Sequence, residues 1–277
     1  MPEPTVAPNP QPSAPSVPAE AYDRDYFLEH CVGFEQWSSS GGRDADGRYL
    51  GCIARARMQP GDRIIDIGTA RGELLPVAVE QGAAWAIGID YSADSVELAR
   101  QTIGAHGMAD RCLAIQADCQ ALPLASGSAD LVFMLDVVEH LTPVELHNTL
   151  GEAHRVLRPG GRLFIHTFPT STVYNVTYRL QRWLLPWRLL GWPANPRTPF
   201  ERRMHVNEQT CARLRRALEA SAPFASIDVR LGEWIHTVFI PTARPRTTYH
   251  RLASHRLTAR FGVANIWAEA TKSAADS

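Results

Sequence analysis

Short apolar runs alternate with amphipathic segments over residues 60–168. The runs are rich in Ile, Val and Phe and have the length of buried strands, whereas the segments between them repeat apolar residues at helical spacing. This alternation predicts an α/β fold with a mostly parallel sheet and helices on both faces, because parallel neighbours are joined by crossovers. The predicted strands are 63–67, 85–89, 112–116, 130–135 and 162–167, and the predicted helices are 72–81, 93–105 and 143–157.

Residues around the last of these helices indicate where it begins and ends. Thr142, Pro143 and Glu145 are typical of a helix start, and the stretch LRPGG at 157–161 is typical of a helix end. The remaining chain predicts a helix at 207–220, a strand near 225–231, a helical stretch at 246–260 and a final strand in ANIWAEATK.

Three parts of the chain depart from this alternation. The first 18 residues contain seven prolines, so residues 1–20 are predicted to be a disordered tail. Residues 21–58 are rich in aromatic residues and predict a helical lid that precedes the main domain at 59–277. An insertion at 170–206, which contains WLLPWRLLGW, is predicted to form a helical cap.

The composition is that of an ordinary globular protein. The chain has 277 residues, of which 45% are hydrophobic, and its net charge is -1. This balance gives no electrostatic footprint for DNA and disfavours RNA as a partner. The five cysteines lack the spacing of a zinc site, so we expect reduced thiols rather than a disulfide framework.

The sequence also bears on membrane contact. No stretch reaches the roughly 18 apolar residues of a spanning helix, and the N-terminus lacks a signal-peptide pattern, so we expect a cytoplasmic location. The basic, amphipathic character of the insertion leaves contact with a membrane surface open. Nothing in the sequence indicates the oligomeric state.

Small and acidic residues gather at the ends of the first predicted strands. Asp66 is followed by Gly68, Ala70 and Gly72, and small residues let a backbone approach a ligand closely. The spacing is one residue shorter than the glycine pattern that binds a dinucleotide pyrophosphate, which disfavours a nicotinamide oxidoreductase.

The next two strands also end in aspartates. Asp90 follows the second strand, where its carboxylate can accept hydrogen bonds from the two hydroxyls of a ribose. Asp118 follows the third strand, where an adenine amino group can reach it. Because the carboxyl ends of parallel strands share one edge of the sheet, the sequence predicts a nucleoside site there.

Four stretches over residues 60–168 resemble the motifs of class I S-adenosylmethionine-dependent methyltransferases: DIGTARG, GIDYS, QADCQALPL and FMLDVVEHL. The resemblance implies a Rossmann-like class I methyltransferase fold with a seven-stranded sheet, and S-adenosyl-L-methionine as cofactor. Thr69 and Ala70 stand where the family usually has Cys or Gly and then Gly, which narrows the turn. The cofactor-binding residues that the resemblance implies are Asp66, Gly68, Thr69, Ala70, Gly72, Asp90, Tyr91, Asp118, Cys119 and Asp136.

The fourth motif, LVFMLDVVEHL, places three ionisable residues directly behind a strand. One interpretation is a capping box, in which Asp136 caps a helix that starts near Val137 and Glu139 reaches back to the cap. That interpretation leaves His140 without a role. The alternative is a metal or acid–base site.

The pattern D-x-x-E-H with a later histidine resembles the constellation of divalent-metal-dependent O-methyltransferases. Here FERRMHVNEQT provides His205 as the later residue. The resemblance implies a Mg²⁺ or Mn²⁺ site of Asp136, Glu139, His140 and His205, with Asp136, His140 and His205 as catalytic residues. A mixed set of carboxylates and imidazoles suits these ions better than it suits structural zinc. His166, in LFIHTFPT, is the second choice to His205.

The leading expectation is an O-methyltransferase acting on a hydroxylated small molecule, a sugar or glycoside first and a quinone-like phenol next, with possible assistance from a divalent metal. The alternatives are a metal-independent N- or C-methyltransferase with His140 or His205 as general base, an RNA 2′-O-methyltransferase, and a non-catalytic module that only binds the cofactor.

Overall fold

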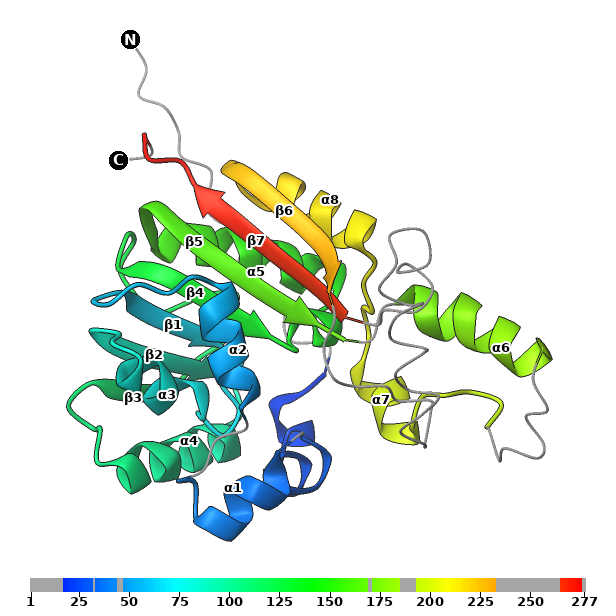
Figure 1. Cartoon of the computed structure of the whole chain (residues 1–277), viewed down its shortest axis with the longest axis horizontal. Coiled ribbons are helices and arrows are strands. Elements are labelled where there is room, and N and C mark those ends of the chain that lie inside the picture. Colours follow the sequence, from blue (N-terminus) through cyan, green and yellow to red (C-terminus); the bar gives the residue numbers. More distant parts are fainter. Residues whose placement is uncertain are drawn as a thin grey trace.

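The protein is described by a computed structural model that covers residues 17–31, 33–43, 47–168, 171–184, 193–232 and 265–275. Its centre is a seven-stranded sheet in the order β3-β2-β1-β4-β5-β7-β6 (Figure 1). β7 pairs antiparallel with both β5 and β6, and the other pairings are parallel. The predicted mostly parallel seven-stranded sheet is therefore confirmed. The strands are β1 (Arg63–Ile67), β2 (Trp85–Asp90), β3 (Cys112–Gln116), β4 (Ala129–Leu135), β5 (Leu157–Thr167), β6 (Phe224–Gly232) and β7 (Asn265–Lys272).

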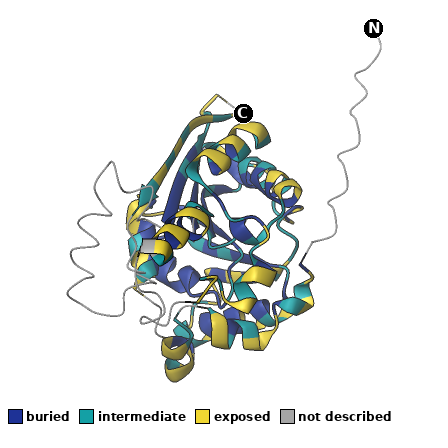
Figure 2. Ribbon diagram, turned by 90° about the vertical axis from the view of Figure 1, so that its right-hand side faces the viewer, coloured by how far each residue is buried: buried dark blue, intermediate teal, exposed yellow. Residues whose placement is uncertain are grey.

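Helices cover both faces of the sheet, as predicted. One face packs against α2 (Arg48–Arg55), α3 (Leu74–Glu80) and α4 (Ala93–His106), and the other packs against α5 (Pro143–Val156) and α8 (Cys211–Ser221). Successive side chains of a strand point to opposite faces, so Ile64 and Phe133 belong to the first core while Ile65 and Met134 belong to the second. Figure 2 shows the strands as a buried layer between these helices.

The strand order reverses between β1 and β4, and this reversal locates the site. The chain runs from β1 outward to β2 and β3 and then returns to β4 on the other side of β1. A crevice opens beyond the carboxyl ends of neighbouring strands whose connections lead in opposite directions. Asp66 near the end of β1 and Asp136 after β4 stand at its two sides.

The predicted strands and helices of residues 60–168 are all present, with one shifted boundary. The start of α5 has a capping box: the Thr142 hydroxyl accepts a hydrogen bond from the Glu145 amide, and the Glu145 carboxylate accepts one from the Thr142 amide. The stretch 157–161, predicted as a helix-ending turn, instead begins β5, with Leu157 paired to Ala129 of β4. Arg158 and Asp130 form an ion pair across these strands, which helps to hold the early part of β5 on β4.

Two additions lie outside this core. The N-terminal part contains η1 (Ala19–Ala21), η2 (Tyr26–His30) and α1 (Phe34–Ser40), and the insertion contains η4 (Val173–Thr177), α6 (Tyr178–Leu184) and α7 (Pro199–Met204). The insertion thus contains helices at 173–184 and 199–204, with the described residues between and after them outside regular elements. The helical stretch predicted at 246–260 and most of the predicted tail lie outside the described residues. Among the helices that the structure describes, none is both long and apolar enough to cross a membrane.

Candidate functional site

A cavity of about 590 Å³ lies at the carboxyl ends of the strands. Its volume is within the range of pockets that hold small ligands. The predicted cofactor residues line it with the single exception of Gly72, and the cavity continues past Glu139, His140 and His205. The strand ends therefore bring the two groups of predicted site residues into one space.

The glycines of the first turn have different structural tasks. Gly68 has φ +73° and a Cβ there would lie 2.4 Å from Val137 Cγ2, so this position needs glycine. Gly72 has φ +71° and a Cβ there would lie 2.7 Å from Ala99 Cβ. Gly72 does not line the cavity, and its lack of a side chain serves the close packing of the turn on α4.

The unusual Thr and Ala of this turn are accommodated by their neighbours. Thr69 donates a hydrogen bond of 2.8 Å to Asp66, and its side chain fills the space above Gly88, where a Cβ would lie 2.6 Å from the Thr69 hydroxyl. Ala70 adopts a left-handed backbone with φ +50°. Burial raises the pKa of Asp66 to about 7, although the Thr69 hydrogen bond opposes this. The turn therefore forms with Thr69 and Ala70 in these two positions.

Asp90 is held in place by backbone donors. The amide of Ala70 donates to one carboxylate oxygen over 3.1 Å, and the amide of Ser92 donates to the other over 3.0 Å. Burial raises the pKa of Asp90, whereas these donors lower it. A carboxylate oxygen can accept more than one hydrogen bond, so Asp90 retains acceptor capacity at the cavity wall.

The residues beyond Asp90 form the rest of this end of the cavity. The Tyr91 ring lies 5.5 Å from that of Tyr22, and the Tyr91 hydroxyl donates to the Val17 carbonyl. Asp118 accepts hydrogen bonds from the amide and the side chain of Gln120, at 2.8 and 3.3 Å. Burial raises the pKa of the Cys119 thiol to about 12, so Cys119 stays protonated.

Asp136 departs from the predicted helix cap. It has φ +57°, no side-chain cap precedes the short turn η3 (Val138–His140), and no α-helix starts at Val137. The capping-box interpretation of Asp136 and Glu139 is therefore wrong. One oxygen of Asp136 lies 2.6 Å from His166 Nδ1, and the other lies 3.9 Å from Arg48. Burial by itself raises the pKa of Asp136, but His166 and then Arg48 hold it below its ordinary value.

His166 orients this aspartate. Its Nε2 lies 3.0 Å from the side-chain oxygen of Asn265, and its ring lies 4.3 Å from that of Trp267. Both residues come from β7, so a distant strand sets the position of the imidazole. With both ring nitrogens engaged, His166 is a positioning residue for Asp136 rather than a free base.

Glu139, His140 and His205 form a second cluster. Each offers one possible metal-ligating atom, and these atoms lie within 4.8 Å of one another. Asp136 is not a member of this group, because its carboxylate pairs with His166. Glu139 is 1% exposed and accepts a hydrogen bond of 2.8 Å from Thr167. Burial and then the charge of Asp136 raise the pKa of Glu139 well above its ordinary value.

The two histidines of the cluster are neutral near pH 7. Burial and the neighbouring His205 lower the pKa of His140 to about 3, and burial lowers the pKa of His205. The rings stand edge to face with centroids 4.9 Å apart. His140 Nδ1 lies 2.9 Å from the Tyr22 hydroxyl. His205 Nδ1 is buried and has no hydrogen-bond partner within the described part of the chain, so it is a candidate acceptor for a ligand proton.

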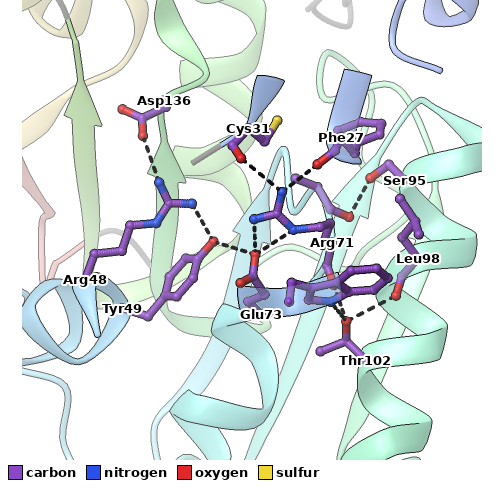
Figure 3. A network of polar contacts seen from close by, with 12 residues as sticks. Phe27, Cys31, Arg48, Tyr49, Arg71, Glu73, Ser95, Leu98, Thr102 and Asp136 are labelled. Carbon is purple, nitrogen blue, oxygen red and sulfur yellow. Dashed lines mark hydrogen bonds and ion pairs between the residues drawn. The ribbon is translucent and has the colours of Figure 1, made fainter. Parts of the chain in front are cut away.

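A charged network beside the cavity was not recognised in the sequence. Arg71, 1% exposed, donates to Glu73 over 3.0 and 2.7 Å and to the Phe27 carbonyl over 2.6 Å. Tyr49 donates to Glu73, and Arg48 donates to Tyr49 (Figure 3). The network ties η2 and α2 to the first turn and ends at Asp136. The only signal in the sequence was the presence of opposite charges inside the turn TARGE.

Aromatic side chains surround the far end of the cavity. Tyr26 and His30 of η2 pack on Phe200 of α7, with ring centroids 5.1 and 4.5 Å apart. Tyr22 lies 5.0 Å from Tyr26 in an edge-to-face arrangement. The N-terminal part and the insertion thus meet beside the neutral histidines.

Part of the chain is similar in sequence to known methyltransferases. Residues 64–161 match the family described as "Methyltransferase domain". The chain is 32% identical over 130 residues to the ubiquinone/menaquinone biosynthesis C-methyltransferase UbiE of Geotalea uraniireducens, covering 46% of this chain and 54% of that protein. It is 34% identical over 111 residues to the 27-O-demethylrifamycin SV methyltransferase of Amycolatopsis mediterranei, covering 40% of each chain. The match thus spans about half the length of these curated relatives, or less.

A solved structure extends the similarity to most of the chain. An S-adenosylmethionine-dependent methyltransferase of Methanosarcina mazei superposes with a TM-score of 0.55 and 18% identity, covering 80% of this chain and 97% of that one. At this identity the likeness concerns the fold alone, and it confirms the Rossmann-like arrangement implied by the four motifs.

Proposed function

Residues 64–161 match a methyltransferase domain, and we propose that this chain is a class I S-adenosylmethionine-dependent methyltransferase that transfers the cofactor's methyl group to a hydroxyl oxygen of a small-molecule acceptor. The observation that carries the proposal is the cluster of Glu139, His140 and His205, which continues the same cavity as the strand-end aspartates. One end suits a nucleoside, and the other holds neutral groups able to accept a proton.

The cofactor assignment follows the lining of the cavity. The Asp90 carboxylate accepts hydrogen bonds from the ribose hydroxyls. Tyr91 packs on the adenine ring, and Asp118 and Cys119 contact the edge of that ring. The methionine end lies against Asp66, Gly68, Thr69 and Ala70, where the narrow turn exposes backbone. We add Arg48 to this end, because its guanidinium lies 3.9 Å from Asp136 and both line the cavity. Together they offer opposite charges to the carboxylate and ammonium of the methionine part.

In catalysis the protein itself has to orient the oxygen of the acceptor hydroxyl and to remove the proton of that hydroxyl. The bound cofactor supplies an electrophilic methyl group on a sulfonium. Reaction then depends on a close and correctly aligned nucleophile. His205 Nδ1 has an unused lone pair in the buried site and takes the proton of the acceptor hydroxyl, while His140 and Glu139 orient that hydroxyl.

A divalent ion belongs to the proposal in its full form. Glu139, His140 and His205 would hold Mg²⁺ or Mn²⁺, which would orient neighbouring hydroxyls and lower their pKa. In this form His205 Nδ1 would bind the ion instead of taking the acceptor's proton, and its lack of a partner and the uncharged state of both imidazoles suit that role. Against it stands the contact between Tyr22 and His140 Nδ1, which has to open for that nitrogen to bind a metal.

The acceptor is proposed to be a hydroxylated natural product or a glycoside. The aromatic side chains of Tyr26, His30 and Phe200 favour an acceptor with a flat or apolar face beside its hydroxyl. The relative from Amycolatopsis mediterranei, whose name describes O-methylation of a rifamycin, supports this class.

Transfer to carbon is the second candidate. It is favoured by the relative named as a quinone-biosynthesis C-methyltransferase, and it needs a base but no metal. Both histidines are uncharged, and His205, whose Nδ1 has no partner among the described residues, fits that role better than His140, whose Nδ1 contacts Tyr22.

One experiment tests both candidates. Purified protein is incubated with methyl-labelled S-adenosylmethionine and a panel of glycosides, phenols and quinones, with chelator or with added Mn²⁺. Labelled O-methyl product that disappears in chelator and returns with Mn²⁺ supports the full proposal. Labelled C-methyl product that is insensitive to chelator supports the second candidate. Absence of any transfer, with tight binding of the demethylated cofactor, would reduce the chain to a cofactor-binding module.

A further inference from the structure

Tyr22 lies between the two ends of the cavity, although none of the four sequence motifs includes it. Its side chain is 7% exposed and lines the cavity. The centroid of its ring lies 5.5 Å from that of Tyr91 on the nucleoside side and 5.7 Å from that of His140 on the acceptor side. The Tyr22 carbonyl accepts a hydrogen bond of 2.6 Å from the Ser92 hydroxyl. Contacts at the nucleoside end therefore hold Tyr22 in place beside His140.

His140 has a hydrogen-bond partner on two sides. The Tyr22 hydroxyl oxygen lies 2.9 Å from His140 Nδ1. His140 also donates a hydrogen bond to the backbone carbonyl of Met204. A neutral imidazole has one N–H donor and one accepting nitrogen, and a tyrosine hydroxyl can donate. Both contacts are satisfied when Tyr22 donates to Nδ1 and the proton of His140 is on Nε2.

These contacts extend to the segment that carries His205. Met204 directly precedes His205 in the chain. Two residues after His205, the amide of Asn207 donates a hydrogen bond of 2.9 Å to the Glu139 carbonyl. The short segment around His205 is thus bound to η3 on both sides, by the His140 ring before it and by backbone after it. A change in the orientation of the His140 ring would therefore displace His205.

We propose that Tyr22 is a positioning residue that acts through His140 and gives the two histidines different roles. By donating to Nδ1, Tyr22 keeps the proton of His140 on Nε2, because the hydrogen bond at one ring nitrogen decides which nitrogen is protonated. His140 can then only donate to further groups. His205 Nδ1 remains the lone pair that takes the acceptor's proton. This inference rests on the metal-free form of the proposed function.

Nitrogen NMR of the full chain, with isotope label in the histidine rings, tests the tautomer without any catalytic readout. The variants His140→Gln and His205→Gln identify the signals of the two rings. In the wild type we expect a protonated Nε2 and an unprotonated, hydrogen-bonded Nδ1 in His140. Tyr22→Phe keeps the aromatic ring and removes only the hydroxyl. It should move the Nδ1 signal to the position of a free lone pair or populate both tautomers.

The control is Tyr178→Phe, because the Tyr178 hydroxyl donates to the Pro193 carbonyl and Tyr178 does not line the cavity. This variant should leave the His140 signals unchanged. Calorimetry with the demethylated cofactor should give the wild type and Tyr22→Phe affinities within about twofold, because phenylalanine keeps the contact with Tyr91.

Three spectroscopic outcomes would overturn the proposal. The first is a proton on Nδ1 of His140 in the wild type, and the second is a Tyr22→Phe variant whose His140 signals equal those of the wild type. The third is loss of the hydrogen-bonded Nδ1 signal when Mg²⁺ alone is added, since the ion would then replace the Tyr22 hydroxyl.

Turnover is measured with the glycoside, phenol or quinone that the labelled panel identifies. Tyr22→Phe should lower kcat about fivefold at unchanged KM, which is the effect of one neutral hydrogen bond. In the His140→Gln background the same change should cause no further loss, because the hydroxyl acts through that ring. Absence of any transfer, with the expected NMR signals, would count against the proposed function and support the arrangement of Tyr22 and His140. Fully additive losses from the two changes would overturn the role proposed for Tyr22.

Discussion

The two ends of the cavity are assembled in different ways. At the nucleoside end, Asp66, Asp90 and Asp118 lie at or just after the ends of three strands, and the sheet brings them together. At the acceptor end, Tyr22 and His205 meet His140 from segments far away in the chain. The first end therefore takes its aspartates from the sheet, with the N-terminal part packed against Tyr91, whereas the second depends on how two added segments dock. Changes at one end should leave the other largely intact.

The largest effect should follow removal of the proton acceptor at the far end. His205→Ala should lower turnover by about a hundredfold or more, because a positioned base contributes roughly that much. Affinity for the demethylated cofactor, measured by calorimetry, should stay within about twofold. His147→Ala is the control, since His147 lies on α5 and contacts Ser221 outside the cavity. Loss of cofactor affinity in His205→Ala would show that the two ends of the cavity are not independent.

The converse change addresses the nucleoside end. Asp90→Ala should weaken cofactor binding by about a hundredfold, because two charge-assisted hydrogen bonds to the ribose are worth about 3 kcal/mol together. Calorimetry measures this directly. Asp94→Ala, which removes a carboxylate bonded to the Arg24 amide, should bind normally. Equal affinity of the wild type and Asp90→Ala would contradict the ribose assignment.

The turn between these ends can be probed through stability. Gly68→Ala should lower the free energy of unfolding by about 2 kcal/mol or more, because a left-handed backbone and the contact with Val137 both oppose a Cβ. Ala70→Gly, at φ +50°, should change it by less than about 1 kcal/mol, since relief of strain offsets the added chain entropy. Urea unfolding measures both. Val137→Ala should rescue Gly68→Ala only in part, because it removes the clash and leaves the backbone strain.

The smallest effect concerns the acid sensitivity of the acceptor end. The pKa of His140 is lowered to about 3, so between its ordinary value near 6.5 and 3 the unfolded chain binds a proton that the folded chain does not. Stability contributed by neutral His140 is therefore complete above pH 6.5 and decreases as the pH falls, by at most ~1.4 kcal/mol per pH unit. His140→Gln should flatten the dependence of the unfolding midpoint on pH. An unchanged slope would mean that His140 takes up its proton at the same pH in the folded and the unfolded chain.

The local pattern of hydrophobic and polar residues was sufficient to predict most of the sheet and the aspartates at the nucleoside end of the cavity. The strands at 63–67 and 112–116, the start of α5 and the aspartates at the ends of β1, β2 and β3 were all predicted, because each depends on residues within a few positions of one another. The early start of β5 at Leu157 was missed, since pairing with β4 overrides the turn character of Pro159 and the two glycines that follow it.

The sequence by itself singled out the ionisable residues at this end of the cavity, but only the tertiary structure decided how they are grouped. Asp136 stands apart from Glu139, His140 and His205 because His166 engages it, and His166 is held by Asn265 from a strand nearly 100 residues later. His140 and His205 meet because α7 packs beside η3. Hydrophobic and polar patterns report the environment of each segment separately. Contacts between distant segments depend on the packing of the whole chain, which no local pattern records.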